Sequence, residues 1–309
     1  MARFDVTIAG ELNLDLILYG LPEVLPPERE LLANDMMLTL GSSSAIVAHN
    51  LASLGSHVGF ISCIGNDQFG QMALERLSAA GVDVSKVVQI SGSVKTGLTV
   101  LLQRNGWRNI LTYPGTIFDL KLEHLDFDYL TSSRHFHFSS FYLQRGLQAH
   151  VVELFKQLRS KGLTISLDCN DDPDDKWMGL EEVLPYVDVF LPNERELKRI
   201  AGTENVEAAI DRLAAIVPLL VVKLGSEGAM AQTGKERVTS PAVKVDLVDP
   251  VGAGDSFDAG FLHEFLRGSD LTTCLRSGNL AGALSVTRPG GTEAFRDAEH
   301  RSNFFKQHR

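Results

Sequence analysis

The chain has 309 residues, of which 44% are hydrophobic and 22% are charged, an ordinary composition for a globular protein. Its 29 basic and 39 acidic side chains give a formal net charge of −10, which disfavours a nucleic-acid partner. No apolar stretch approaches the roughly 20 residues needed to span a bilayer, and no signal peptide is evident, so we expect a cytoplasmic protein without a membrane partner.

Strand-like and helix-like segments alternate in the first third of the chain. Their order is strand, helix, strand and helix, over residues 4–10, 42–54, 57–65 and 69–80. Gly55 and Gly81 follow the two predicted helices, where glycine commonly ends a helix.

The alternation resumes after residue 130. Strands are predicted over residues 135–140, 163–168, 187–191 and 219–224. Helices are predicted over residues 147–161, 194–201, 206–216, 254–266 and 271–286. This pattern favours an α/β fold, with a mostly parallel sheet covered on both faces and ligands bound beyond the carboxyl ends of its strands.

Two segments interrupt the alternation. Residues 11–40 contain Pro22, Pro26 and Pro27 between short extended runs, and residues 94–113 resemble a hairpin whose turn is Asn105-Gly106. Together they could form a small sheet outside the main one; the alternative is two unrelated surface excursions. Without a long linker or an internal repeat, we expect residues 1–309 to form one domain.

The cysteines and the paired histidines suggest no metal site. Cys63, Cys169 and Cys274 are widely spaced and form no CxxC pair, so we expect reduced, buried thiols. His135 and His137 alternate in a predicted strand without a third ligand nearby, so we expect ordinary packing.

The strongest chemical signal is the sequence DPVGAGDSF at residues 249–257. Gly252, Ala253 and Gly254 leave backbone amides bare at the start of a helix, where unpaired N–H groups and the helix dipole favour an anion. Asp255 falls in the first turn, where its carboxylate could contact a substrate hydroxyl while the amides hold a phosphoryl group. The alternative is an ordinary glycine-rich helix start. The segment is neither a Walker A loop nor a dinucleotide fingerprint.

Polar side chains also follow predicted strands elsewhere. Asn13 and Asp15, in GELNLD, offer the donors and acceptors that a polyol requires, although a polar turn would look the same. Asp168 and Asn170 end another strand and could approach a nucleotide or a substrate.

These motifs resemble the signatures of the ribokinase-like, PfkB-type carbohydrate kinases. Residues 249–257 are close to the family pattern DTxGAGD, with Pro250 where Thr is frequent. Residues 41–55 resemble GGxxxNxAxxLAxLG in their second half, but Ser42 and Ile46 replace the usual Gly and Asn. The sequence IGNDQFG matches the family's G-x-D-x-x-G turn, and PNERE matches its Asn-x-x-Glu motif.

The resemblance implies a three-layer α/β/α sandwich with a small β-sheet lid formed by about residues 12–40 and 94–118. It also implies ATP-dependent phosphorylation of a hydroxyl on a small sugar-like substrate. The implied catalytic set is Asp255, as the base, and an anion hole formed by Gly252, Ala253 and Gly254. Implied substrate contacts are Asn13, Asp15, Gly41, Ser42 and Ser43. Implied nucleotide contacts are Asn193, Lys223, Gly225, Ser226, Gly228 and Asn279.

Two cation sites are implied as well. Glu196 would hold Mg²⁺ through water, although Glu196 and Asn193 also form an ordinary capping-box pattern. A K⁺ site beside the anion hole would use mainly backbone carbonyls, from Asp249, Val251, Ser285, Arg288 and Gly290. ATP and the sugar are the implied small-molecule partners, and a second copy bound through the lid is the protein partner to consider.

Two other functions on the same fold stay open: a nucleoside kinase and a non-catalytic ligand sensor. An intact Asp255 and glycine-rich loop argue against the sensor. Since Ile46 replaces a polar family residue, we expect an apolar face in the pocket and poor turnover of ribose.

Overall fold

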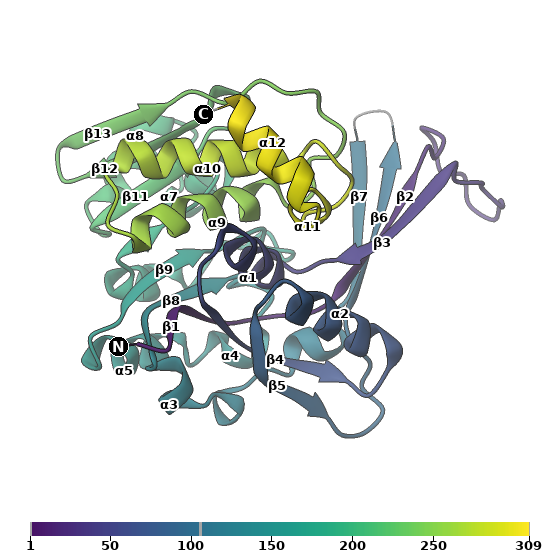
Figure 1. Ribbon diagram of the computed structural model, residues 1–309, viewed down its shortest axis with the longest axis horizontal. Coiled ribbons are helices and arrows are strands. Elements are labelled where there is room, and N and C mark those ends of the chain that lie inside the picture. The colour runs from purple at the N-terminus through teal and green to yellow at the C-terminus, as the bar shows by residue number, and fades with distance from the viewer. Residues whose placement is uncertain (1, 105–106, 309) are drawn as a thin grey trace.

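Two β-sheets organise the protein (Figure 1). The computed structural model describes residues 2–104 and 107–308. In spatial order the nine-stranded main sheet consists of β13 (Glu236–Ser240), β12 (Ala229–Thr233), β11 (Leu219–Lys223), β10 (Val189–Phe190), β9 (Thr164–Asp168), β8 (Ser133–Ser139), β1 (Phe4–Ala9), β4 (Val58–Gly65) and β5 (Asp83–Ile90). Its pairs are parallel from β11 to β5, and β12 and β13 add an antiparallel hairpin at one edge.

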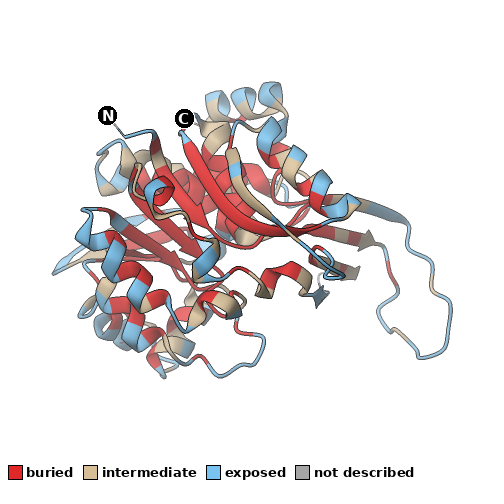
Figure 2. Ribbon diagram, turned by 90° about the horizontal axis from the view of Figure 1, so that it is seen from below, coloured by how far each residue is buried: buried red, intermediate tan, exposed pale blue. Residues whose placement is uncertain are grey.

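Helices cover both faces of the main sheet because its strands bury apolar side chains on both sides. One core cluster joins the strands to the helices α3 (Phe127–Leu130), α5 (Val151–Ser160), α6 (Leu180–Val183), α7 (Glu194–Ala201) and α8 (Val206–Ala214). The other joins them to α1 (Ser43–Leu54), α2 (Gln68–Ala79), α9 (Ala253–Leu266) and α10 (Leu271–Ser285). Figure 2 shows the buried strands between these two layers. The predicted α/β/α sandwich is therefore confirmed.

The remaining helical elements are short or lie at the edges of the sandwich. Near the C-terminus, α11 (Glu293–Arg296) and α12 (Ala298–His308) pack against α10 through a separate small apolar cluster. The other segments are α4 (Arg145–Gln148) and the 3₁₀ turns at Gly115–Phe118, Leu122–His124, Leu184–Tyr186 and Gly225–Glu227.

The second sheet has four strands and projects from one side of the sandwich (Figure 1). Its order is β3 (Asp35–Leu40), β2 (Leu14–Tyr19), β6 (Leu98–Arg104) and β7 (Trp107–Tyr113), with β2 and β6 parallel and both edge pairs antiparallel. Ile17 and Leu101, on its inner face, pack with Val251 just before α9.

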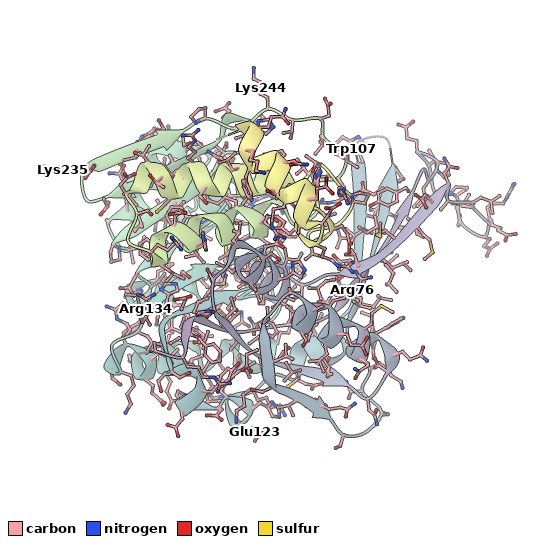
Figure 3. All side chains as sticks on the ribbon, in the orientation of Figure 1. Arg76, Trp107, Glu123, Arg134, Lys235 and Lys244 are labelled. Atoms are coloured by element: carbon pink, nitrogen blue, oxygen red, sulfur yellow. The ribbon has the colours of Figure 1, made fainter. Side chains whose placement is uncertain are left out.

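Arg76 on α2 links this second sheet to the sandwich (Figure 3). Its guanidinium donates to the Leu38 carbonyl of β3 at 2.9 Å and pairs with Glu293 of α11, also at 2.9 Å. Thr39 donates to the same Glu293 carboxylate at 2.7 Å. The base of the second sheet is therefore held by a partly buried charged contact as well as by apolar packing.

The structure departs from the predicted elements in a few places. The helix expected at residues 147–161 is interrupted at Ala149–His150, which separates α4 from α5. Strand β5 and the β12–β13 hairpin were not predicted, because edge strands with one exposed face carry a weaker apolar pattern. The hairpin expected at residues 94–113 forms as β6 and β7, while its Asn105-Gly106 turn lies outside the described residues.

Among the described residues, no helix combines the length and the apolar character needed to cross a membrane. The three cysteines are free and buried, as expected. His135 and His137 are also buried, and their ring nitrogens are hydrogen-bonded to the hydroxyls of Thr164, Ser166 and Ser139.

Candidate active site

The predicted anion hole lies at the start of α9. Gly252 precedes the helix with a φ of 71°, a left-handed conformation that glycine adopts without strain. A methyl group added there would lie 2.6 Å from the Gly291 Cα, so the close approach of two backbone segments also requires glycine. Ala253, Gly254 and Asp255 form the first turn, and the Asp255 side chain is buried.

Ile46 supports this loop from behind. The side chain is only 3% exposed, and its methyl groups face Gly252 and Gly291. Asn50, one turn further along α1, donates to the Gly291 carbonyl and to the Ser256 hydroxyl, both at 3.0 Å. Ile46 therefore packs against this backbone, and its expected role as an apolar face of the pocket stays a prediction.

The predicted substrate residues converge where β1 ends and β2 begins. A methyl group added at Gly41 would lie 2.1 Å from the Asp15 Oδ1 and 2.9 Å from the Asn13 Nδ2, so glycine leaves room for both side chains. Ser42 is the N-cap of α1: its hydroxyl accepts from the Ala45 amide and donates to a backbone carbonyl. The Ser42 hydroxyl is thus occupied by a structural role.

Two buried carboxylates face each other across this region. Burial, together with the charges of Asp255 and Asp249, raises the pKa of Asp15 to about 7. Burial also raises the pKa of Asp255 to about 6, with a contribution from Asp168, while Lys223 and a hydrogen bond from Ser43 oppose the rise. A carboxylate with a pKa near 6 is ionised at neutral pH, yet it is basic enough to take a proton from a hydroxyl as phosphoryl transfer proceeds.

Lys223 does not extend freely toward a phosphate. Its ammonium lies 2.7 Å from Asp168 and 3.2 Å from both oxygens of Asp258; the two carboxylates are buried, and the Lys223 side chain is 10% exposed. The Lys223 ammonium is also directly beside the first turn of α9: it lies 3.6 Å from the position that a methyl group on Gly254 would occupy. Lys223 thus belongs to an ion-pair network beside the start of α9, and the nucleotide contact predicted for it stays a prediction.

Asn193 and Glu196 form the capping box that the sequence left as an alternative. The Glu196 amide donates to Asn193 Oδ1 at 3.0 Å, and the Asn193 amide donates to Glu196 Oε2 at 2.9 Å. Burial and the neighbouring Asp168 raise the pKa of Glu196 to about 7. Ligand atoms of Asp168, Cys169 and Glu196 lie within 4.8 Å of one another. Buried carboxylates with this excess of negative charge suit a hydrated Mg²⁺, which keeps several of its waters.

The other predicted nucleotide residues lie around the β11–β12 loop. Gly225 and Gly228 have φ of 58° and 100°, and a methyl group at Gly228 would lie 2.1 Å from the Ser240 carbonyl. Ser226 is exposed between them. The Asn279 amide, on α10, donates to the carbonyls of Ser240 and Pro241 at 3.0 and 3.1 Å. Asn279 therefore anchors the chain that borders this loop.

The predicted K⁺ residues are brought together by the Asp249 carboxylate. It accepts from the amides of Val251 and Gly290, at 3.0 and 3.1 Å. Tyr19 and Gln103 of the second sheet also donate to it, at 2.9 and 3.3 Å. In the same region the Ser285 hydroxyl is buried without a protein partner among the described residues, whereas the Arg288 side chain turns away to pair with Asp297 at 2.8 Å.

Sequence reasoning missed three polar residues of this site: Glu11, Ser140 and Asp258. The carboxylate of Glu11 accepts from the hydroxyls of Ser44 and Ser140, both at 2.7 Å. Asp258 had a detectable signal, because it lies three residues after Asp255 on the same helix and so on a neighbouring part of its surface. Ser140 follows a strand with no motif around it, so no local pattern identified it.

The carboxyl edge of the main sheet thus brings together the glycine-rich start of α9, the buried Asp255 carboxylate and the acidic pair Asp168 and Glu196. The chain belongs to the pfkB family of carbohydrate kinases, whose pattern matches residues 3–298. It is 31% identical to an ATP-dependent ribose-1-phosphate kinase of Halopiger xanaduensis, over 94% of each chain. It is 29% identical to a 2-dehydro-3-deoxygluconokinase of Bacillus subtilis, over 87% of each chain.

A solved structure gives the same assignment. An Escherichia coli protein described as a ribokinase II, in complex with ATP and Mg²⁺, superposes with a TM-score of 0.86 at 26% identity. The match covers 98% of this chain and 99% of the other. The predicted family and the carbohydrate-kinase activity are thus confirmed.

The Lys223 network generates a prediction about stability. Lys223→Met leaves Asp168 and Asp258 without their cation, and breaking a buried ion pair by removing one partner costs about 3–5 kcal/mol. Adding Asp258→Asn removes one of the uncompensated charges, so the double variant should be more stable than Lys223→Met alone. Urea unfolding at pH 7.5 measures both. Equal stability of the single and double variants would show that Lys223 and Asp258 are not coupled.

Proposed function

We propose that this carbohydrate kinase transfers the γ-phosphoryl group of ATP to a hydroxyl of a small sugar-like substrate, with Asp255 accepting the hydroxyl proton. The observation that carries the proposal is the position of Asp255. Its buried carboxylate lies in the first turn of α9, directly beside the amides that would hold the transferring group, of which that of Ala253 donates to the Pro250 carbonyl at 3.3 Å.

Each part of the site has one task in this proposal. Asn13 and Asp15 orient the acceptor hydroxyls, while the amides of Gly252, Ala253 and Gly254 stabilise negative charge on the phosphoryl oxygens. Phosphoryl transfer has a loose transition state, so the proton can leave late and Asp255 need not be a strong base. Glu196 would hold Mg²⁺ through water, and the bound ion would neutralise phosphate charge.

The nucleotide would extend from the anion hole toward the β11–β12 loop. Gly225, Ser226 and Gly228 lie in that loop, and Asn279 holds the chain beside it. Asn193 starts α7, so its polar side chain also lies at the carboxyl edge of the sheet.

We further propose that residues 1–309 act as one catalytic unit whose lid consists of residues 12–40 and 94–118. The packing of Ile17 and Leu101 on Val251 supports this, because it joins the second sheet to the loop before α9. A lid in this place would exclude water, which otherwise competes with the sugar as acceptor. The need for ATP and the three free thiols support a cytoplasmic location, and the net charge of −10 does not favour nucleic acid.

A nucleoside kinase on the same fold is the second candidate, and a non-catalytic sensor is the third. All three would bind a polyol between Asn13 and Asp255. They differ in whether ADP is released and in whether the acceptor carries a base.

The catalytic prediction uses Asp255→Asn. Release of ADP is first measured with a panel of sugars, sugar acids and nucleosides, and the best acceptor is then used for the variant. Loss of the base should lower kcat by about 10²–10⁴. ATP affinity should persist, because the backbone amides remain.

The stability of Asp255→Asn provides its control. The folded protein raises the pKa of Asp255 above its ordinary 3.8, so ionisation opposes folding once the pH exceeds that value, and the full cost is reached above about pH 6. Asparagine removes this cost, so Tm at pH 8 should stay the same or rise. A folded variant with more than about a tenth of wild-type turnover would contradict the role of Asp255.

We propose a K⁺ site beside the anion hole, formed by Asp249, Val251, Ser285, Arg288 and Gly290 through mainly backbone oxygens. The buried, unpartnered Ser285 hydroxyl and the joining of the two loops through Asp249 support it. The prediction is a higher kcat in KCl than in tetramethylammonium chloride at equal ionic strength. Identical rates in the two salts would remove the site from the proposal.

We also propose a homodimer formed through the outer face of the lid. Leu16, Leu38, Val100 and Leu111 form one cross-strand row on that face, opposite the buried Ile17 and Leu101. Leu111 is 56% exposed, and Trp107 is exposed at the end of β7 (Figure 3). An apolar sheet face of this kind is best covered by an equal face of a second copy.

Light scattering tests the dimer. The wild type should have about twice the 33.8 kDa mass of one chain, and Leu111→Arg should reduce it to one chain by placing a charge in the apolar row. Ile110→Arg is the matched control. Ile110 is next to Leu111 in β7 and is equally exposed, but its side chain lies on the opposite face of the sheet. A monomeric wild type, or the same mass for both variants, would contradict the proposed interface.

A further inference from the structure

Two residues next to Asp255 have unusual backbone conformations. Ser140, directly after β8, and Asn170, two residues after β9, both have a φ of 54°. Left-handed backbone is uncommon in residues other than glycine, and when surrounding contacts maintain it the strain often belongs to a functional site. Both residues lie at the carboxyl edge of the main sheet, where the strand ends meet α9.

The hydrogen bonds of Asn170 define the orientation of its amide. Its Oδ1 accepts from the Ser140 backbone amide at 2.8 Å. Its Nδ2 therefore points the other way, toward Asp168 Oδ2 and Asp255 Oδ1, each at 3.4 Å. An amide offers donors on one side and an acceptor on the other, so no other orientation satisfies these neighbours.

Ser140 is itself held from the opposite side. Its hydroxyl donates to Glu11 Oε1 at 2.7 Å, and the other Glu11 oxygen accepts from the Ser44 hydroxyl at 2.7 Å. Gly10 permits this arrangement, because a methyl group there would lie 2.0 Å from the Ser44 hydroxyl oxygen. The chain Glu11–Ser140–Asn170 thus leads from the start of α1 to the proposed base.

We propose that Asn170 is a positioning residue, which orients the Asp255 carboxylate through its side-chain N–H group. This inference rests on the proposed role of Asp255. The Nδ2 lies between two carboxylates, Asp168 and Asp255, that would otherwise repel each other. A neutral donor there favours the ionised form of both without adding a charge, and it restricts rotation of the base.

The electrostatic surroundings make this donor important. The charged groups whose fields reach Asp255 come from every element around it: Glu11, Asp15, Asp168, Glu196, Lys223 and Asp258. Five of these six groups are acidic. The hydrogen bond from Asn170 therefore acts in the same direction as Lys223, against a strongly negative environment.

The test compares two substitutions with opposite structural consequences. Asn170→Asp keeps the shape and the oxygen that faces Ser140, but replaces the donor with a second oxygen. Asn170→Gly removes the whole side chain, while glycine adopts a φ of 54° without strain. Both variants should lower kcat by about 10–100-fold, because a small misplacement of the base costs that much. KM for ATP should change less than about threefold, since Asn170 does not face the amides of the anion hole.

Two further measurements separate positioning from stability. In Asn170→Asp the acidic limb of the pH profile of kcat should move to higher pH. The reason is that the new carboxylate, beside those of Asp168 and Asp255, raises the pKa of Asp255. In Asn170→Gly, Tm should be maintained or should rise while kcat falls.

Asp175→Gly is the matched control. Asp175 is a left-handed residue of the same loop, with a φ of 50°, and its carboxylate accepts from the Trp177 indole instead of contacting Asp255. It should retain wild-type kcat.

The inference is overturned if both folded Asn170 variants keep more than a third of wild-type kcat with an unshifted acidic limb. It is also overturned if Asp175→Gly loses as much activity as Asn170→Gly, since relief of loop strain would then explain both. Asp255→Asn, assayed in parallel, keeps the two proposals apart. An inactive Asp255→Asn beside active Asn170 variants rejects the positioning role alone, whereas an active Asp255→Asn rejects the catalytic assignment itself.

Discussion

The site depends on keeping a buried carboxylate ionised at the start of a helix. Burial raises the pKa of Asp255, and the acidic neighbours raise it further. Three features act in the opposite direction: the dipole of α9, the ammonium of Lys223 beside the first turn, and hydrogen bonds from Asn170 and Ser43. The balance leaves a carboxylate that is ionised at neutral pH and still able to bind a proton, as the proposed base requires. This arrangement lowers the stability of the folded protein at neutral pH, as is common for sites preorganised for chemistry.

Close backbone approach is the second constraint, and it explains the glycines of the site. Gly252 passes within contact of Gly291, Gly41 lies against Asn13 and Asp15, and Gly228 lies against Ser240. A single methyl group would overlap with backbone atoms at Gly252 and Gly228, and with the two polar side chains at Gly41. Ile46 fills the space behind two of these segments, so an apolar residue in the middle of a polar motif has a packing role.

The second sheet is joined to the chemistry by few but specific contacts. Asp249 receives hydrogen bonds from Tyr19 and Gln103 on one side, and from the loop before α9 and the loop after α10 on the other. Movement of the sheet would therefore be transmitted to the loop that carries the anion hole. The same buried carboxylate lies in the proposed K⁺ site, so lid position and cation binding would share one set of contacts.

Local sequence patterns were sufficient to predict the alternation of strands and helices, the glycine-rich start of α9 and the protein family. These features are contiguous, and hydrophobic period, capping residues and turn glycines act over a few residues. Local patterns placed Asp168 and Asn170 at the end of a strand and Lys223 beside the nucleotide site, but they did not show that Asn170 contacts Asp255 or that Lys223 pairs with Asp168. The Asn170–Asp255 contact spans 85 residues and the Lys223–Asp168 pair spans 55, and both exist only because parallel strands end at one edge of the sheet. Sequence motifs therefore identify the candidate residues from their immediate neighbours in the chain. The protonation, orientation and pairing of these residues depend on which strand ends the fold brings together.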